Sequence, residues 1–151
     1  MVSWGELEAA SPSIARGGRR LLHARGDGEA LLATVRGENP PRIHPINVGI
    51  VDGQLVAFLL ASAKRDDLER DGRYALHTHQ DPAAPDELSC RGRARLVTDP
   101  VARAAAAAAW PFEVDDTYHL FAFDIEAAIL GLRAADEWPP RYERWPPKGR
   151  S

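Results

Sequence analysis

The Asp52-Gly53 pair is the feature of this sequence that most restricts its fold. It separates two apolar runs, RIHPINVGIV (42–51) and QLVAFLL (54–60), and an Asp-Gly pair in that position is typical of a two-residue β-hairpin. The two runs are therefore predicted to be antiparallel strands joined by a tight turn.

Other segments show the same apolar content bounded by turn residues. Besides the two hairpin strands, strands are predicted over 30–36, 73–79, 88–97, 117–125 and 127–134. Gly92 is expected to mark a bulge or a close approach within its strand. The Pro-rich tail, 136–151, is predicted to contain no regular element. About six strands joined by hairpins and short helices favour an antiparallel barrel with helices outside it.

Helix starts are recognised by their capping residues. Ser3 and Glu6 form a capping-box pattern, and Thr98 or Asp99 followed by Pro100 is a typical helix start. Helices are predicted after Ser3, over 14–22 with an interruption at Gly17-Gly18, over 62–70 between Ser62 and Asp71-Gly72, and over 101–110.

The composition restricts the class of protein. A chain of 151 residues is most simply one domain, with a barrel core at about 28–135. A net charge of −3 and a pI near 5.9 provide no general attraction for nucleic acid, and no apolar run is long enough to cross a membrane. The N-terminus does not have the pattern of a secretory signal, and Cys90 is the single cysteine, so a cytoplasmic protein with Cys90 as a packed thiol is expected.

Lys64 and Arg65 follow the helix-capping residue Ser62, where the helix dipole prefers anions. A phosphate bound to the free N–H groups of this first turn would reverse the unfavourable interaction. The alternative is that both side chains point outward and pair with Asp66, Asp67 or Glu69. From these residues alone, both interpretations remain open.

Pro45, in the segment RIHPIN (42–47), removes one hydrogen-bond donor from a predicted strand. Proline is normally confined to an edge strand or a bulge, so nearby backbone groups are free to bond to something else. An ordinary edge strand with an exposed His44 is the alternative.

His77 and His79 lie two residues apart on a predicted strand and therefore share a face, which would suit a metal. A third ligand would have to come from His44, His119 or Glu87, none of which stands at a persuasive spacing. Solvated or structural histidines are favoured, and a metal-binding barrel is kept as an alternative function.

The order of these segments resembles the pyridoxamine 5'-phosphate oxidase-like FMN-binding split-barrel family over roughly residues 5–135. Three motifs carry the resemblance: the His-Pro-Ile segment before the hairpin, the Ser-x-Lys-x-x-x-Leu segment after it, and the G-x-A-x-L-V-x-D-P run from Gly92 to Pro100. The resemblance implies a mainly β (α+β) fold, a six-stranded antiparallel split barrel with short peripheral helices, and a homodimer with the flavin between subunits.

The resemblance also implies the cofactor site. Ser62 and Lys64 would hold the FMN phosphate, with Arg65 as an addition, and the flavin ring would lie along the His44-Pro45 strand. The expected cofactor-binding residues are Arg42, His44, Pro45, Ile46, Asn47, Leu60, Ala61, Ser62, Lys64 and Arg65.

The expected function is that of an FMN-dependent oxidoreductase acting on a small molecule. No catalytic acid or base is assigned, although His44 or His119 could act near the flavin. The chain ends in RWPPKGRS and lacks the arginine-histidine substrate motif of the family's vitamin oxidases, so that substrate is not carried over. The alternative is a barrel that holds a flavin, deazaflavin or haem without turnover.

Overall fold

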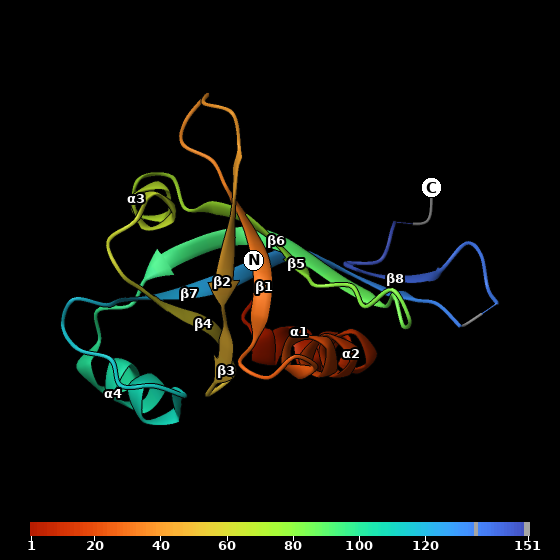
Figure 1. Cartoon of the computed structure of the whole chain (residues 1–151), viewed down its shortest axis with the longest axis horizontal. Helices are drawn as coiled ribbons and strands as arrows, with labels where there is room; N and C mark the ends of the chain where they lie inside the picture. The colour runs from red at the N-terminus through yellow and green to blue at the C-terminus, as the bar shows by residue number, and fades with distance from the viewer. Residues whose placement is uncertain (135, 150–151) are drawn as a thin grey trace.

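In the computed structural model, which describes residues 1–134 and 136–149, eight strands form one antiparallel sheet (Figure 1). The remaining positions of the predicted core and tail, 135 and 150–151, lie outside the described residues. The strands are β1 (Glu29–Thr34), β2 (Arg42–Asn47), β3 (Gly49–Val51), β4 (Gln54–Leu59), β5 (Arg73–Thr78), β6 (Glu87–Leu96), β7 (His119–Leu132) and β8 (Arg141–Trp145).

The sheet returns on itself through the β2–β3 segment. Its strand order is β2-β1-β5-β6-β7-β4-β3, with β8 paired to β7, so the two ends of the order are consecutive in the chain. Val48 alone separates β2 from β3, and its N–H donates to the carbonyl of Gly28 at 2.9 Å. The predicted Asp52-Gly53 hairpin is confirmed, since it joins β3 to β4. The predicted mainly β, barrel-like fold is also confirmed.

The strand count and one boundary differ from the prediction. The seven strand segments predicted for the expected six-stranded barrel become eight strands, partly because the 42–51 segment is divided at Val48. The segments 117–125 and 127–134 are instead one 14-residue strand, β7. Glu126 is the extra residue of a bulge at the register shift opposite Arg91 and Gly92, so the alternation changes phase while the strand continues. The close approach expected at Gly92 is confirmed.

The prediction of an irregular C-terminal tail is wrong for its central part. Arg141–Trp145 forms β8 and pairs with β7 from Leu132 back to Ala128. The prolines of the tail flank this five-residue stretch and do not interrupt it, so its N–H groups are available for pairing.

Four helices connect or cover the strands in the described ranges: α1 (Trp4–Ala10), α2 (Pro12–His23), α3 (Ala63–Arg70) and α4 (Pro100–Ala109). The caps predicted at Ser3, Ser62 and Asp99 are present, each side chain accepting a backbone N–H of the first turn. The break predicted at Gly17-Gly18 is absent because these glycines let α2 pack against Leu130 and Leu88 without interrupting the helix.

The core lies inside the curled sheet and beneath α1 and α2, where Trp4, Leu7, Phe121 and Phe123 are fully buried. From Leu55 to Leu59, β4 is buried on both faces, because the barrel interior lies on one side and the segment around α4 covers the other. Because both faces of this strand are buried, its residues are consecutively apolar and do not alternate with polar ones.

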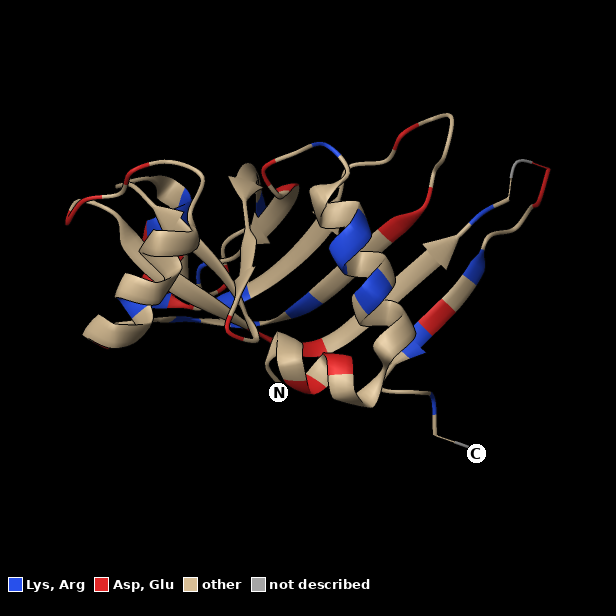
Figure 2. Ribbon diagram, turned by 90° about the horizontal axis from the view of Figure 1, so that it is seen from below, with Lys and Arg blue, Asp and Glu red and all other residues tan. Residues whose placement is uncertain are grey.

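Charged residues of both signs are interspersed over the strands and helices (Figure 2). Within the described ranges, no helix has both the length and the apolar character needed to cross a bilayer.

Candidate functional site

A cavity of about 400 Å³ opens where β2, the end of β4, the start of α3 and the segment after α4 meet. Its lining is mostly apolar and aromatic, with few polar groups, as is usual for small-molecule sites. The lining residues are Pro45, Ile46, Asn47, Phe58, Leu59, Leu60, Ser62, Lys64, Trp110, Phe112 and Tyr118.

Six of the ten residues predicted from sequence line this cavity: Pro45, Ile46, Asn47, Leu60, Ser62 and Lys64. The other four, Arg42, His44, Ala61 and Arg65, are outside its lining. The fold therefore brings together the His-Pro strand and the Ser-x-Lys segment, which lie more than a dozen residues apart in the chain.

Ser62 shapes the polar end of the cavity. Its Oγ accepts the Arg65 N–H at 3.3 Å and donates to the Leu60 carbonyl at 3.0 Å. The N–H groups of Ala63 and Lys64 are in the first turn of α3, where no intrahelical acceptor exists. The start of this helix thus directs hydrogen-bond donors and a positive dipole end toward the cavity mouth.

Among residues 1–134 and 136–149, Lys64 is the one charged side chain in the cavity lining. Its Nζ donates to the Pro45 carbonyl at 2.8 Å, which connects α3 with β2. Partial burial lowers the pKa of the Lys64 ammonium. The contact explains how β2, an edge strand as Pro45 predicts, is held beside the helix start.

Arg65 points away from the cavity. Its guanidinium donates to the Leu59 and Thr117 carbonyls at 3.4 and 3.1 Å, and its Nε lies 3.7 Å from Glu69. The interpretation that both side chains point outward is therefore met only in the ion pair of Arg65 with Glu69, because the Arg65 side chain is only 16% exposed.

Asp67 is not an outward-facing partner of Lys64 or Arg65, because it is only 1% exposed. Its Oδ2 accepts from Thr34 Oγ1 at 2.7 Å and from Arg42 Nε at 3.0 Å. The hydrogen bonds from Arg42 hold the pKa of the Asp67 carboxyl below its ordinary value, although burial opposes this effect. Asp67 shares the inner face of α3 with Leu68, whereas Asp66 is exposed.

His44 belongs to the same network. Its Nε2 lies 2.9 Å from Thr34 Oγ1, which in turn donates to Asp67. Burial and the nearby Lys64 charge lower the pKa of His44, which favours the neutral imidazole. Arg42 and His44 therefore connect β2 with α3 behind the cavity and do not line it.

The aromatic wall of the cavity was not predicted from the sequence. Phe58 meets Trp110 edge to face at 5.2 Å between ring centroids, and Phe112 lies 6.1 Å from both Trp110 and Tyr118. Three of these rings are close together in WPFEVDDTY (110–118), after a helix and before a strand. Aromatic residues clustered in such a connection were the signal that could have identified them.

The histidines considered for metal binding have other contacts. His77 Nε2 lies 3.2 Å from Glu87 Oε2, and His119 Nδ1 lies 2.6 Å from Glu69 Oε1. In the described part of the chain, no three His, Cys, Asp or Glu side chains are grouped as a metal site requires. The prediction for Cys90 is confirmed, since the thiol is buried and burial raises its pKa to about 12.

Solved structures share this fold, while no protein-family model and no curated protein sequence matches the chain. A haem-binding protein from Mycobacterium smegmatis has a TM-score of 0.62 at 17% identity, over 85% of this chain and 56% of its own. A NimC/NimA family protein from Clostridium acetobutylicum has a TM-score of 0.62 at 16% identity, over 85% and 92%. HutZ, the haem storage protein of Vibrio cholerae, has a TM-score of 0.59 at 14% identity, over 77% and 89%.

These neighbours are split-barrel proteins of the pyridoxamine 5'-phosphate oxidase-like type. This chain has the split-barrel fold. The resemblance identified from its motifs is thereby confirmed at the level of the fold. The chain spans little more than half of the length of the Mycobacterium protein.

The Asp67 network leads to a prediction for the stability of this split barrel. Asp67→Asn removes the charge but keeps the shape, and it should lower the free energy of unfolding at pH 7 by about 2 kcal/mol. Because the pKa of Asp67 is lower in the folded state, its contribution is present above about pH 4 and is lost as the pH falls through the folded value. Urea unfolding at several pH values measures both effects.

Asp66→Asn is the matched control, since Asp66 is the exposed neighbour on the same helix. It should leave the unfolding free energy within about 0.5 kcal/mol of the wild type. Equal effects of the two substitutions, or a difference that persists unchanged at pH 2, would contradict the role of the buried carboxylate.

Proposed function

We propose that this chain binds FMN in the cavity between β2, β4 and α3 and acts as an FMN-dependent oxidoreductase on a small molecule. The observation that carries the proposal is the position of the Lys64 ammonium beside the Ser62-capped start of α3, at one end of an apolar, aromatic cavity. This arrangement combines an anion-binding end with a surface suited to a flat ring.

The phosphate would lie at the helix start. Lys64 Nζ and the first-turn N–H groups of Ala63 and Lys64 are donors, and a phosphate accepts from all of them. The Ser62 hydroxyl would turn its hydrogen from the Leu60 carbonyl toward the phosphate while still accepting the Arg65 N–H. Ser62 would then contribute both to the helix cap and to the ligand.

The ring system would lie against β2 and the aromatic wall. Pro45, Ile46 and Asn47 belong to an edge strand, and the polar edge of a flavin would meet the outer backbone of this strand, where the Pro45 carbonyl already accepts from Lys64. Trp110 and Tyr118 provide apolar ring surface. Bound flavin supplies the hydride or electron transfer, while the residues of the chain bind it, orient it and exclude water.

The lining favours a flavin over haem. Among the residue types that ligate haem iron, the lining contains only Tyr118 in the part of the chain that the structure describes. Haem has two propionates, whereas Lys64 is the single cation that the described residues contribute to the lining. The Mycobacterium and Vibrio structures are described as haem proteins, so haem remains the alternative for this chain, and a deazaflavin would satisfy the same phosphate and ring contacts as FMN.

The homodimer is also a proposal, supported by an apolar surface next to the cavity. Ile43 is 74% exposed and Leu31 is 37% exposed, and the pairing of β2, β1 and β5 places Ala33 and Ala75 on the same face. Pro45, which lines the cavity, is the register partner of Leu31. A second copy covering this face would reach the edge of the site.

Purified protein is expected to bind FMN with a flavin absorbance band that is retained through gel filtration. Lys64→Ala combined with Ser62→Ala should weaken FMN binding by about 10- to 100-fold, because charge-assisted bonds to the phosphate are lost. Riboflavin, which lacks the phosphate, should bind to both proteins about equally. Fluorescence titration with the two ligands measures the dissociation constants.

Lys148→Ala is the control, since Lys148 is the other lysine of the chain and is exposed in the tail. It should leave both affinities unchanged. Equal losses of FMN and riboflavin affinity in the double variant would contradict a phosphate site at α3. Tight binding of haem without binding of FMN would contradict the flavin proposal and support a haem-binding barrel.

The oxidoreductase part is tested by reduction of the bound flavin. Under anaerobic conditions, NADH or NADPH is expected to bleach the flavin band, and an added acceptor should restore it. A flavin that stays oxidised with both donors would instead support the non-catalytic binding protein.

The proposed dimer predicts an effect of Ile43→Glu, which places a charge in the apolar face. The wild-type chain, of 16.6 kDa, should sediment at twice this mass, and the variant at the mass of one chain. Val101→Glu is the control, because Val101 is 77% exposed on α4, away from β2. A wild-type protein that sediments as a monomer would contradict the proposal.

A further inference from the structure

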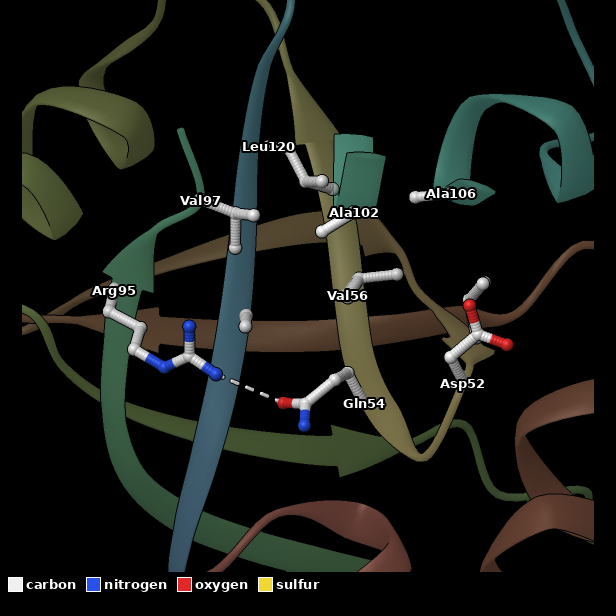
Figure 3. A pocket seen from close by; sticks show the side chains of 10 residues that line it. Asp52, Gln54, Val56, Arg95, Val97, Ala102, Ala106 and Leu120 are labelled. Atoms are coloured by element: carbon white, nitrogen blue, oxygen red, sulfur yellow. Dashed lines mark hydrogen bonds between the residues drawn. The ribbon is translucent and has the colours of Figure 1, made fainter. Parts of the chain in front are cut away.

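A second cavity, of about 210 Å³, lies between α4 and the outer face of β4, β6 and β7 (Figure 3). It shares no lining residue with the proposed flavin cavity. The lining residues are Val51, Asp52, Gln54, Val56, Arg95, Val97, Ala102, Ala106, Leu120 and Ala122.

Short side chains on α4 create this space. Ala102 and Ala106 are one turn apart on the side of the helix that faces the sheet. Opposite them, Ala122 of β7 is the register partner of Val56 on β4 and of Arg95 on β6. The short side chain of Ala122 therefore faces the short side chains of Ala102 and Ala106. The walls on this side are apolar, which favours the apolar part of a small ligand.

Arg95 forms the polar end of the cavity. Its Nε donates to Asp124 Oδ2 at 3.0 Å, and one terminal nitrogen donates to Gln54 Oε1 at 3.1 Å, as the dashed line in Figure 3 shows. Figure 3 shows the other terminal nitrogen turned toward the side on which Val97 lies. This nitrogen has no hydrogen-bond partner within residues 1–134 and 136–149, so Arg95 presents a positioned free donor.

The surrounding charges determine which acceptor suits this donor. The Arg95 charge is already balanced by Asp124, and the lining also contains Asp52, which forms no ion pair among the described residues. A ligand carboxylate would add a further negative charge beside the two aspartates. An uncharged oxygen accepts the free N–H without that repulsion.

We propose that the cavity beneath α4 binds a small neutral molecule with an apolar body and one carbonyl oxygen, such as a ketone, an amide or an ester of about one-ring size. The apolar body lies among Val56, Leu120 and Ala106, and the carbonyl oxygen accepts from Arg95. This site is separate from the flavin cavity and does not depend on the proposed flavin function.

Three probes of similar size test the proposal on the full chain: acetophenone, ethylbenzene and benzoate. Saturation-transfer NMR and calorimetry should rank acetophenone as the tightest ligand, about 3- to 10-fold above ethylbenzene, because one hydrogen bond is gained. Benzoate should bind more weakly than acetophenone. Arg95→Met should remove the preference for acetophenone over ethylbenzene.

Filling the cavity tests its location. Ala106→Leu should abolish binding of acetophenone and ethylbenzene, whereas Ala104→Leu, which places the same side chain on the exposed side of α4, should leave it unchanged. If Ala106→Leu does not fold, Ala102→Leu fills the more open end of the same cavity. Absence of binding by all three probes, tightest binding of benzoate, or acetophenone binding that persists in the filled variant would each overturn the proposal.

Discussion

The candidate site depends on the hydrogen bonds that the buried Asp67 carboxylate accepts. It accepts hydrogen bonds from Thr34 of β1 and Arg42 of β2, and it belongs to α3. A buried carboxylate is strongly unfavourable unless it is paired and hydrogen-bonded, so these three elements are held to one another. Because α3 and β2 both contribute to the lining of the larger cavity, the same network holds Lys64 beside the Pro45 strand.

The β2–β3 segment provides the second constraint. It pairs with β1 through one part and with β4 through the other, so the sheet curls and leaves the outer side of β2 as an edge. The edge is not left to pair with another strand, because Pro45 has no N–H and Lys64 donates to the Pro45 carbonyl. An exposed edge strand could otherwise pair with a strand of another chain. Here β2 lines a cavity instead.

The helix α4 separates two cavities of different chemistry. Trp110, at its C-terminal end, belongs to the aromatic wall beside Lys64, whereas Ala102 and Ala106 face the smaller cavity beside Arg95. The larger cavity presents Lys64, which forms no ion pair within the described ranges, and the start of α3, and both suit an anion. The smaller one presents a cation already matched by Asp124, which suits a neutral acceptor.

Local signals in the sequence determined the secondary structure near the site. The Ser62 cap, the Asp52-Gly53 turn and the edge character of Pro45 depend on neighbouring residues, and each is present in the structure. The position of Lys64 at the helix start follows from the same cap. These signals predict the conformation of short segments. The order of the motifs along the chain indicates the fold.

Tertiary structure alone decided which side chains meet. Asp67 looks like any solvated aspartate in a charged helix, and only the position of β1 and β2 against α3 buries it. The aromatic wall likewise needs Phe58 and Trp110, which are 52 positions apart in the chain, to be placed together. The sequence by itself determined most of the helices and strands and the capped start of α3 with Lys64 in its first turn, because these depend on neighbouring residues. The cavities and the buried network arise from packing between distant segments, which no local pattern specifies.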